Sequence, residues 1–580
     1  MRSTKILALT LAFPILLVPD ATAQTPAGTA DDPPGACRAS ARYTATGLAT
    51  HSATYLAAAE VTGRAPLAPN LIRRPSRVRA RPVCDDGGAL PWRRRAEPAP
   101  PGVVVVSAEV RILPATLHAE VNTAYPRDRN NGALWAGRGL STGLIGGVEA
   151  RWGPLSVAIA PELYHQMNRR FDLVEVSAPG HSPLIYPWHR ARIDWPQRFG
   201  TEPFWTLDPG QSYARLEGYG LTAGVSNESL WWGPAIRNPI LLSNTAPGFP
   251  HAFLGTAHPI DIRIGRLEAE AVWGRLRESD YFDNDPTNDR RLFAGLILDF
   301  EPRWLPGLFL GAARIHTETL PADGLSLTEQ AIRPYRDVKS NPQGPVGGDN
   351  QIISLFGRWV HPRSGFETYF EWAREDHWLD VKSLLMMPDA SQAYTLGFRK
   401  VVETGSKWVH LYGELTHLQD ALPILYAGRG VLTYYTHSQV RQGHTHRGQL
   451  LGAAIGPGSD AQTLGVDVFH AKGLIGGAIE RVRYDADAYY AIWTQYYGPH
   501  GYDVEYTGSV HQLLFIRNLD VKWGVAFSYR YNRNYLGLDG SNWDFQSERN
   551  WNFRLGVTWR PEPRPTDPVP EPPVTAPEGR

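Results

Sequence analysis

Alternation of apolar and polar residues runs through most of the chain. From residue 103 to residue 560, apolar side chains recur at every second position in short stretches separated by turn residues. In residues 521–531 the odd positions are apolar or aromatic, and residues 551–560 repeat the pattern. Because successive side chains of a strand point to opposite faces, each stretch predicts a β-strand with one apolar face.

The number and length of these stretches favour a membrane barrel over a soluble sheet, which also alternates. About twenty candidate strands of roughly 9–11 residues can be marked, a length that crosses a bilayer when tilted. Trp551 and Trp559 lie at the two ends of one apolar face, as the aromatic girdles of membrane barrels require. We therefore predict an all-β fold, a transmembrane antiparallel β-barrel of about 18 strands with a small N-terminal helical segment. Closure pairs every strand edge inside lipid.

The alternation also predicts which side chains face lipid. A one-residue shift of register would invert the assignment, so the prediction is specific. The expected lipid-facing set is Val521, Trp523, Val525, Phe527, Tyr529 and Tyr531, and the expected lumen-facing set is Lys522, Ser528 and Arg530.

The N-terminus has the features of a secretory signal. Arg2 and Lys5 precede an apolar run at residues 6–18, and Ala21 and Ala23 supply a small-residue cleavage pattern. The run is too short to span a bilayer as a helix. Export combined with a barrel indicates the outer membrane. The expected organisation is a signal peptide at 1–23, a helical and Arg-rich segment at 24–101, the barrel at 102–560 and a disordered Pro-rich tail at 561–580.

The segment 24–101 lacks the two-residue alternation of the rest of the chain. We expect a helix over residues 39–61 that ends at Gly63. Two readings of the arginines that follow stay open, contact with an anionic surface or a solvated linker. These arginines are Arg73, Arg74, Arg77, Arg79, Arg81, Arg93, Arg94 and Arg95.

Both cysteines, Cys37 and Cys84, lie in this same segment. An exported compartment permits a disulfide, which we expect between them, and two free thiols are the alternative.

Composition excludes several classes of function. The chain carries 58 basic and 58 acidic residues, so nucleic acid is not an expected partner. A mean hydropathy of −0.31 excludes a helical membrane bundle but not a barrel. The sequence contains no H-E-x-x-H motif, no P-loop and no dinucleotide fingerprint, so we expect no cofactor.

Three groups of residues resemble known catalytic or metal sites, and each also has a structural interpretation. Residues 139–143 fit the serine-hydrolase elbow around Ser141, but the flanks predict a loop entering a strand. The histidines His437, His444 and His446 resemble a short metal clip in a polar loop that lacks a carboxylate. The acidic group Asp280, Asp283, Asp285 and Asp289 lacks EF-hand spacing and is typical of a solvated hairpin tip. We expect no metal site and no catalysis.

The most unusual stretch lies between residues 192 and 279. It combines adjacent tryptophans with Asn, Arg and Asp, as sugar recognition needs, because pyranose faces pack on aromatic rings while amide and guanidinium groups reach hydroxyls and carboxylates. The alternative is a large structural loop inside the barrel, with Gly and Pro fixing its turns.

Within it, Trp231 to Pro234, Asn238 and Leu242 to Pro250 resemble the signature of the capsule assembly Wzi family. The resemblance covers about 60–90 residues closely and the rest in architecture only, and Thr245 stands where a second Asn is expected. It implies an outer-membrane barrel that attaches or organises capsular polysaccharide as a lectin rather than an enzyme. The polysaccharide-binding roles that it implies fall on Trp231, Trp232, Arg237, Asn238 and Asn244, unless the motif holds the fold.

The expected partners are capsular or other surface polysaccharide and outer-membrane lipid. A passive diffusion channel is the main alternative, although the long loop between Gln166 and Gln211 could plug the lumen. An outer-membrane hydrolase, for which Ser141 is the only candidate, is a weaker alternative.

Overall fold

The computed structural model describes residues 40–43, 51–77, 81–84, 90–92, 103–105, 108–189, 191–321, 326–336, 349–375, 385–386, 389, 391–420, 433–492, 501–536 and 547–561. The predicted signal segment, Cys37 and residues 562–580 of the predicted tail lie outside these ranges.

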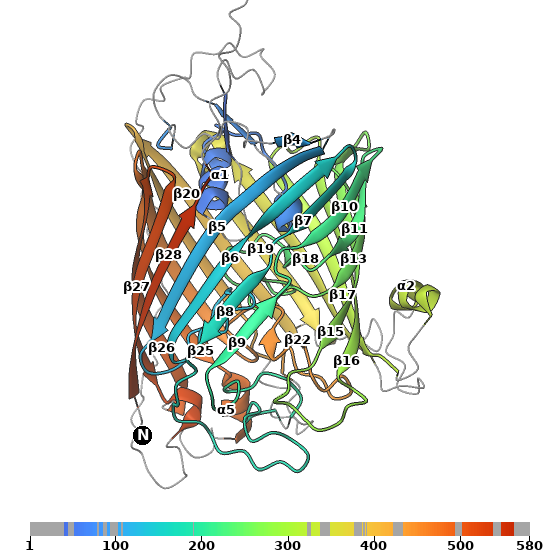
Figure 1. Cartoon of the computed structure of the whole chain (residues 1–580), viewed down its shortest axis with the longest axis vertical. Coiled ribbons are helices and arrows are strands. Elements are labelled where there is room, and N and C mark those ends of the chain that lie inside the picture. The colour runs from blue at the N-terminus through green and yellow to red at the C-terminus, as the bar shows by residue number, and fades with distance from the viewer. Residues whose placement is uncertain are drawn as a thin grey trace, which may run out of the picture.

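The described strands form a closed antiparallel barrel of 18 strands (Figure 1). Strands pair in chain order, and β28 (Ser547–Trp559) pairs with β5 (Ala108–Asn122) to close the sheet. Three wall positions are interrupted strands: β7 and β8 both pair with β6, β9 and β10 continue one another, and β13 and the two-residue β14 both pair with β15. The predicted fold class is confirmed.

The other strands of the wall are β6 (Gly139–Trp152), β7 (Leu155–Ile159), β8 (Glu162–Gln166), β9 (Phe204–Asp208), β10 (Tyr213–Gly218), β11 (Leu221–Ser226), β13 (His251–Thr256), β15 (Gly265–Arg277), β16 (Arg290–Pro302), β17 (Leu308–Thr319), β18 (Asp349–His361), β19 (Phe366–Glu375), β20 (Gln392–Thr404), β21 (Lys407–His417), β24 (Asp460–His470), β25 (Gly473–Tyr484), β26 (Asp503–Ile516) and β27 (Leu519–Tyr531). The short strands are β1 (Ser40–Tyr43), β2 (Ile72–Arg73), β3 (Arg81–Cys84), β4 (Val103–Val105), β12 (Trp231–Trp232), β14 (Ile260–Asp261), β22 (Thr445–His446) and β23 (Gln449–Leu450). The helices are α1 (His51–Val61), α2 (Leu327–Arg336) and α5 (Ala486–Ile492), with 3-10 turns at Pro75–Arg77, Pro362–Ser364 and Arg533–Tyr535. Among the described residues, no helix is long and apolar enough to cross a membrane.

The two ends of the barrel differ in their connections. One end has two-residue turns, as at 153–154, 471–472 and 517–518, whereas loops at the other end are long, as at 123–138 and 167–203. Outer-membrane barrels place short turns in the periplasm and long loops outside the cell. The end near α1 is therefore periplasmic, and the end near α5 is extracellular (Figure 1).

Burial confirms the predicted faces of the last strands. Trp551, Phe553 and Leu555 are 45%, 44% and 46% exposed on the outer surface. Ser528 and Arg530 are buried on the lumen side, where they bond to Thr507 and Asp503. An apolar outer surface on a closed barrel is that of an outer-membrane protein.

The N-terminal helix is shorter than predicted. It ends at Val61, ahead of Gly63 with φ of +73°, but it begins at His51 rather than at residue 39. Residues 40–43 instead form β1, which pairs with β3 so that Ser40 lies opposite Cys84. Strand pairing here overrides local helix propensity, as tertiary contacts often do. Because Cys37 lies outside the described residues, its disulfide with Cys84 stays a prediction.

The N-terminal segment lies inside the barrel and not on a surface. Tyr55 of α1 stacks between Trp92 and Trp408, at 4.5 and 5.1 Å. Glu60 of α1 forms a buried ion pair with Arg358 of β18 at 2.8 Å. These contacts join α1 to the strand walls in one hydrophobic core inside the barrel.

For Arg73 and Arg74, the first residues of the Arg-rich segment, both interpretations (contact with an anionic surface and a solvated linker) are wrong. Arg74 is 1% exposed and pairs with Glu270 at 2.5 Å and Glu228 at 3.8 Å, both also buried. Arg73 lies over the ring of Trp231 at 5.1 Å. The free-energy cost of removing a buried charge from water is offset only by such partners. A solvated linker does not provide them. The side chains of the other six arginines lie outside the described part of the chain.

Candidate functional site

The segment that carries the predicted motif folds into the lumen. Its two tryptophans form β12, which pairs with β2 of the N-terminal segment, with Trp231 opposite Arg73 and Trp232 opposite Ile72. Gly233, with φ of +94°, turns the chain directly after β12, as the Gly-Pro sequence predicts. The chain then returns, and Trp232 donates its backbone N–H to the carbonyl of Leu242 at 3.2 Å.

Both tryptophans are packing residues in this structure. Each is 1% exposed. The Trp231 indole donates to the carbonyl of Ala235 at 3.0 Å. Trp232 lies so close to Gly295 of β16 that a Cβ there would come within 2.6 Å of its ring. Neither ring offers a face to a ligand, whereas the resemblance implied a binding role for both.

Arg237 and Asn238 are fixed to the wall through their backbone. The Glu414 carboxylate of β21 accepts the backbone N–H groups of Ile236 and Asn238 at 2.7 and 2.8 Å. The Arg237 guanidinium extends further and donates to Glu480 of β25 at 3.0 Å. With 31% of its side chain exposed, Arg237 is open to solvent, whereas Asn238 is buried.

Asn244 and Thr245 dock the motif onto the extracellular loop 123–138. Asn244 donates to the carbonyl of Asn130 at 3.1 Å, and the Thr245 hydroxyl reaches the side-chain oxygen of Asn130 at 3.2 Å. Asn130 in turn donates to the carbonyl of Arg237 at 2.9 Å. Thr245 therefore still makes a hydrogen bond although the resemblance predicted Asn there.

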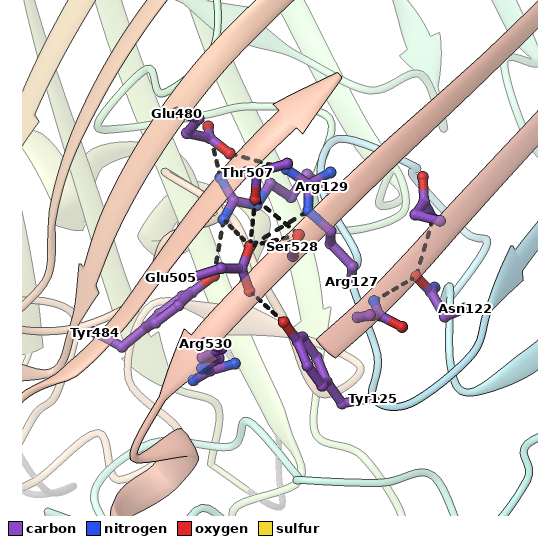
Figure 2. A network of polar contacts seen from close by, with 12 residues as sticks. Asn122, Tyr125, Arg127, Arg129, Glu480, Tyr484, Glu505, Thr507, Ser528 and Arg530 are labelled. Atoms are coloured by element: carbon purple, nitrogen blue, oxygen red, sulfur yellow. Dashed lines mark hydrogen bonds and ion pairs between the residues drawn. The ribbon is translucent and has the colours of Figure 1, made fainter. Parts of the chain in front are cut away.

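This docking brings Arg237 into a cluster of guanidinium groups, part of which Figure 2 shows. Arg127 and Arg129 project from loop 123–138 onto Glu480, at 2.9 and 2.8 Å. Arg127 also reaches Glu505 of β26 at 3.4 Å, and the Tyr125 hydroxyl donates to the same carboxylate at 3.2 Å. Three cations thus share two carboxylates at the extracellular end of the lumen.

Electrostatics keeps this cluster charged. Burial alone would lower the pKa of Arg237, but Glu480 at 3.0 Å outweighs it and raises the pKa above its ordinary value. Glu480 likewise raises the pKa of Arg129 against the effect of burial. We define the guanidinium cluster as Arg127, Arg129 and Arg237 with Glu480 and Glu505.

Sequence reasoning found one member of the guanidinium cluster, Arg237, and missed the other four. The inward parity of Glu480 and Glu505 on their strands is a signal that could have marked them as lumen residues. Nothing in the sequence indicated that Arg127 and Arg129 fold inward, because loop conformation depends on contacts with distant segments.

The residues of the other candidate sites make structural contacts. Ser141 lies within β6, 2% exposed and opposite Glu120 and Gln166, so it lacks the strand–turn–helix setting of an elbow. His444 donates to the carbonyl of Leu241 at 2.6 Å, and the pKa of His444 falls to about 4 through burial. His446 accepts the backbone N–H of Arg277, and His437 that of Val440. Asp283 and Asp285 accept backbone N–H groups of their own turn.

The loop after Gln166 contributes to closing the extracellular end (Figure 1). Its Tyr186 and Ile193 belong to the same hydrophobic core as α1. Asp194, fully buried, accepts the backbone N–H and the hydroxyl of Ser279 at 2.7 and 2.5 Å.

Comparison with known proteins gives a likeness of fold. No family model matches the chain, and no curated protein matches it. Among solved structures it is similar to Wzi, an outer membrane protein involved in group 1 capsule assembly in Escherichia coli and described as a carbohydrate-binding β-barrel. The two share 11% identity over 77% of this chain and 84% of that one, with a TM-score of 0.52.

Two further similar structures are OccK2 (OpdF) of Pseudomonas aeruginosa and a BenF-like porin from Pseudomonas fluorescens. Their identities are 12% and 10%, over 77% and 78% of this chain and 96% and 98% of theirs, with TM-scores of 0.36 and 0.35, which support no inference. The predicted resemblance is confirmed at the level of architecture: this chain is an outer-membrane β-barrel that has the fold of Wzi.

Proposed function

We propose that this barrel binds a polysaccharide at its extracellular end and helps attach or organise the capsule at the cell surface, as a lectin without catalysis. The observation that carries the proposal is the guanidinium cluster with the amides of Asn130 and Asn244 beside it. Guanidinium groups pair with sugar carboxylates in bidentate geometry, and amides exchange hydrogen bonds with hydroxyls.

The charge of the cluster favours an acidic polymer. Within the guanidinium cluster three guanidinium groups face two carboxylates, while the neighbouring Glu414 is engaged by the backbone N–H groups of Ile236 and Asn238. Arg237 is the member with the greatest side-chain exposure, at 31% against 8% and 9% for Arg127 and Arg129. We therefore propose Arg237 as the first contact and Asn244, which is half-buried, as a supporting one.

The likeness to Wzi supports the same assignment. Wzi is described as a carbohydrate-binding barrel of capsule assembly, and the motif through which this sequence resembles its family is the segment that positions Arg237 and Asn244. The buried tryptophans of that motif then serve to hold the segment in place.

The test is retention of the cell's own surface polysaccharide by purified full-length protein. Arg237→Ala should lower retention about tenfold, the scale of one charge-assisted hydrogen bond. Arg303→Ala is the matched control, because Arg303 is an exposed arginine paired with Asp261 at the periplasmic end. Heat-modifiable migration on gels reports folding in both.

Equal retention by the two folded variants would refute the proposed role of Arg237. Failure of the wild-type protein to retain any surface polysaccharide would refute the function itself.

A further inference from the structure

Two arginines face each other across neighbouring strands on the outside of the barrel. Arg277 at the end of β15 lies opposite Arg290 at the start of β16, both at the extracellular edge. Val272 and Leu276 of β15 belong to the interior core, so Arg277, of opposite parity, points outward. Both arginine side chains are exposed. Like charges directly opposite each other destabilise a sheet unless something neutralises them.

A second arginine pair occupies the same edge on another part of the wall. Arg169, just beyond β8, donates its backbone N–H to the carbonyl of Arg138, just before β6, at 2.8 Å. Leu140 of β6 and Leu163 of β8, on the same two strands, are 37% and 39% exposed on the lipid side, and the side chain of Arg169 is exposed while that of Arg138 is half-buried. The guanidinium of Arg138 donates to the carbonyls of Thr123 and Arg170, contacts that leave its charge unbalanced.

Two further outward arginines lie near girdle tryptophans at the same edge of the barrel. Arg275 lies two residues above Trp273 on β15, and Arg549 lies two residues above Trp551 on β28. The Arg549 guanidinium also lies 5.8 Å from the ring centre of Tyr529. We define the arginine margin as Arg138, Arg169, Arg275, Arg277, Arg290 and Arg549.

The arginine margin forms no ion pairs like those at the opposite end. None of its six side chains pairs with a carboxylate in the described part of the chain, although the loop between Arg277 and Arg290 carries Asp280, Asp283, Asp285 and Asp289; of these, Asp283 and Asp285 accept backbone N–H groups of their own turn. At the periplasmic edge, Arg303 pairs with Asp261 at 2.5 Å, Arg266 with Glu301 and Arg111 with Glu109 at 2.6 Å.

We propose that the arginine margin binds the phosphate groups of anionic glycolipids in the outer leaflet. The margin lies directly above the aromatic and apolar belt, at the height where lipid headgroups begin. Guanidinium groups bind phosphate oxygens in bidentate geometry, and two guanidiniums facing each other can share one phosphate. The proposal is independent of the polysaccharide function, because it concerns the outside of the wall and not the lumen.

The experiment measures co-purification of lipid with the full-length protein. The protein is extracted in mild detergent, mixed with a glycolipid bearing two phosphates or with the same glycolipid after dephosphorylation, and the bound lipid is counted by native mass spectrometry. Wild-type protein should retain the phosphorylated form at least about tenfold better, since each arginine near a charged lipid surface contributes about fivefold.

Variants locate the site. Arg277→Gln with Arg290→Gln, and separately Arg138→Gln with Arg169→Gln, should each reduce retention of the phosphorylated lipid by more than about tenfold. Arg266→Gln with Arg303→Gln, at the periplasmic edge, is the control and should change it less than about twofold. All the exchanged side chains are partly or fully exposed, and heat-modifiable migration checks that the barrels stay folded.

Equal retention of the two lipid forms by the wild-type protein would overturn the proposal without any variant. So would an equal loss in the control, or displacement of the lipid by millimolar inorganic phosphate, which would show a free-anion site.

Discussion

At the scale of single residues, the difference between recognition and packing is decided by exposure. Trp232 and Arg237 belong to one motif and are equally conspicuous in the sequence, yet one is 1% exposed and the other has 31% of its side chain open. The tryptophan is packed within the segment, and the exposed arginine is the residue that we propose as the ligand contact.

Trp232→Ala should therefore destabilise the barrel instead of weakening a contact. Deleting a fully buried aromatic side chain costs about 3–5 kcal/mol. The temperature at which the folded gel band disappears should fall, while Trp205→Ala, at a lipid-facing position 68% exposed in the protein alone, should lower it less because no cavity is left in a packed core. Normal thermal stability of Trp232→Ala together with lost polysaccharide retention would restore the tryptophan as a ligand contact.

A second residue-scale prediction concerns the cysteines. If Cys37 and Cys84 are joined in the mature protein, alkylation under non-reducing conditions labels neither and alkylation after reduction labels both. Quantitative labelling without reductant would contradict the disulfide.

At the scale of elements, each strand has one face in lipid and one in the lumen. The same substitution therefore changes the free energy of unfolding by different amounts on the two faces. In β27, Val525 shares the outward parity of Tyr531, which is 42% exposed, and Lys522 shares the inward parity of Ser528. The alternation predicted from sequence fixes this difference before any packing is considered.

Val525→Arg should lower the free energy of unfolding by roughly 2–4 kcal/mol, because it places a charge against hydrocarbon. Lys522→Arg, in the same strand, should cost less than about 0.5 kcal/mol, since it keeps the charge in the lumen. Urea unfolding in lipid vesicles measures both. Equal changes in the free energy of unfolding for the two substitutions would show that the assignment of lipid-facing and lumen-facing positions in β27 is wrong.

The extracellular elements carry buried carboxyls that make them sensitive to pH. Burial raises the pKa of Asp194 to about 6 and that of Asp487 in α5 to about 7. Both values lie above those of an unfolded chain, near 4, so the folded state holds the protons more tightly between these limits. Raising the pH from about 4 to 8 should therefore destabilise these elements.

Limited proteolysis of loop 167–203 should accelerate from pH 5 to pH 8. Ionisation of each buried carboxyl should lower the free energy of unfolding by about 2 kcal/mol. Asp194→Asn should flatten this pH dependence, and Asp172→Asn, at an exposed position in the same loop, should not. A pH profile that is the same in all three proteins would refute the assignment.

At the scale of the whole molecule, the packing of the interior bears on the choice between the proposed binding protein and a diffusion channel. One hydrophobic core joins α1, the motif segment, residues 434–455 and inward residues of many strands. A channel needs a continuous polar path, and a hydrophobic core inside the barrel works against one, which favours the proposed lectin over a channel.

Planar-bilayer recordings should thus show no steady open state for the full-length protein. A porin of similar strand number, measured in the same membranes, gives the expected scale of conductance. Stable ohmic steps from this protein would favour the diffusion channel over the lectin.

Much of the architecture could be predicted from the sequence, because it depends on local periodicity. Alternation fixes strand type and facing, and strand number and turn residues indicate a closed barrel in the outer membrane. The motif at residues 231–250 pointed to the segment that carries Arg237 and Asn244. These features follow from neighbouring residues along the chain, so no knowledge of distant contacts is needed.

Only the tertiary structure decided how the interior is used. It buried Arg74 against Glu228 and Glu270, replaced the first part of the predicted helix with β1, and brought Arg127 and Arg129 onto Glu480. Arg127 and Glu480 are 353 residues apart in the chain. Such pairs depend on how loops fold back into the lumen, and no period in the sequence encodes that, because burial of a charge is set by partners that arrive from elsewhere.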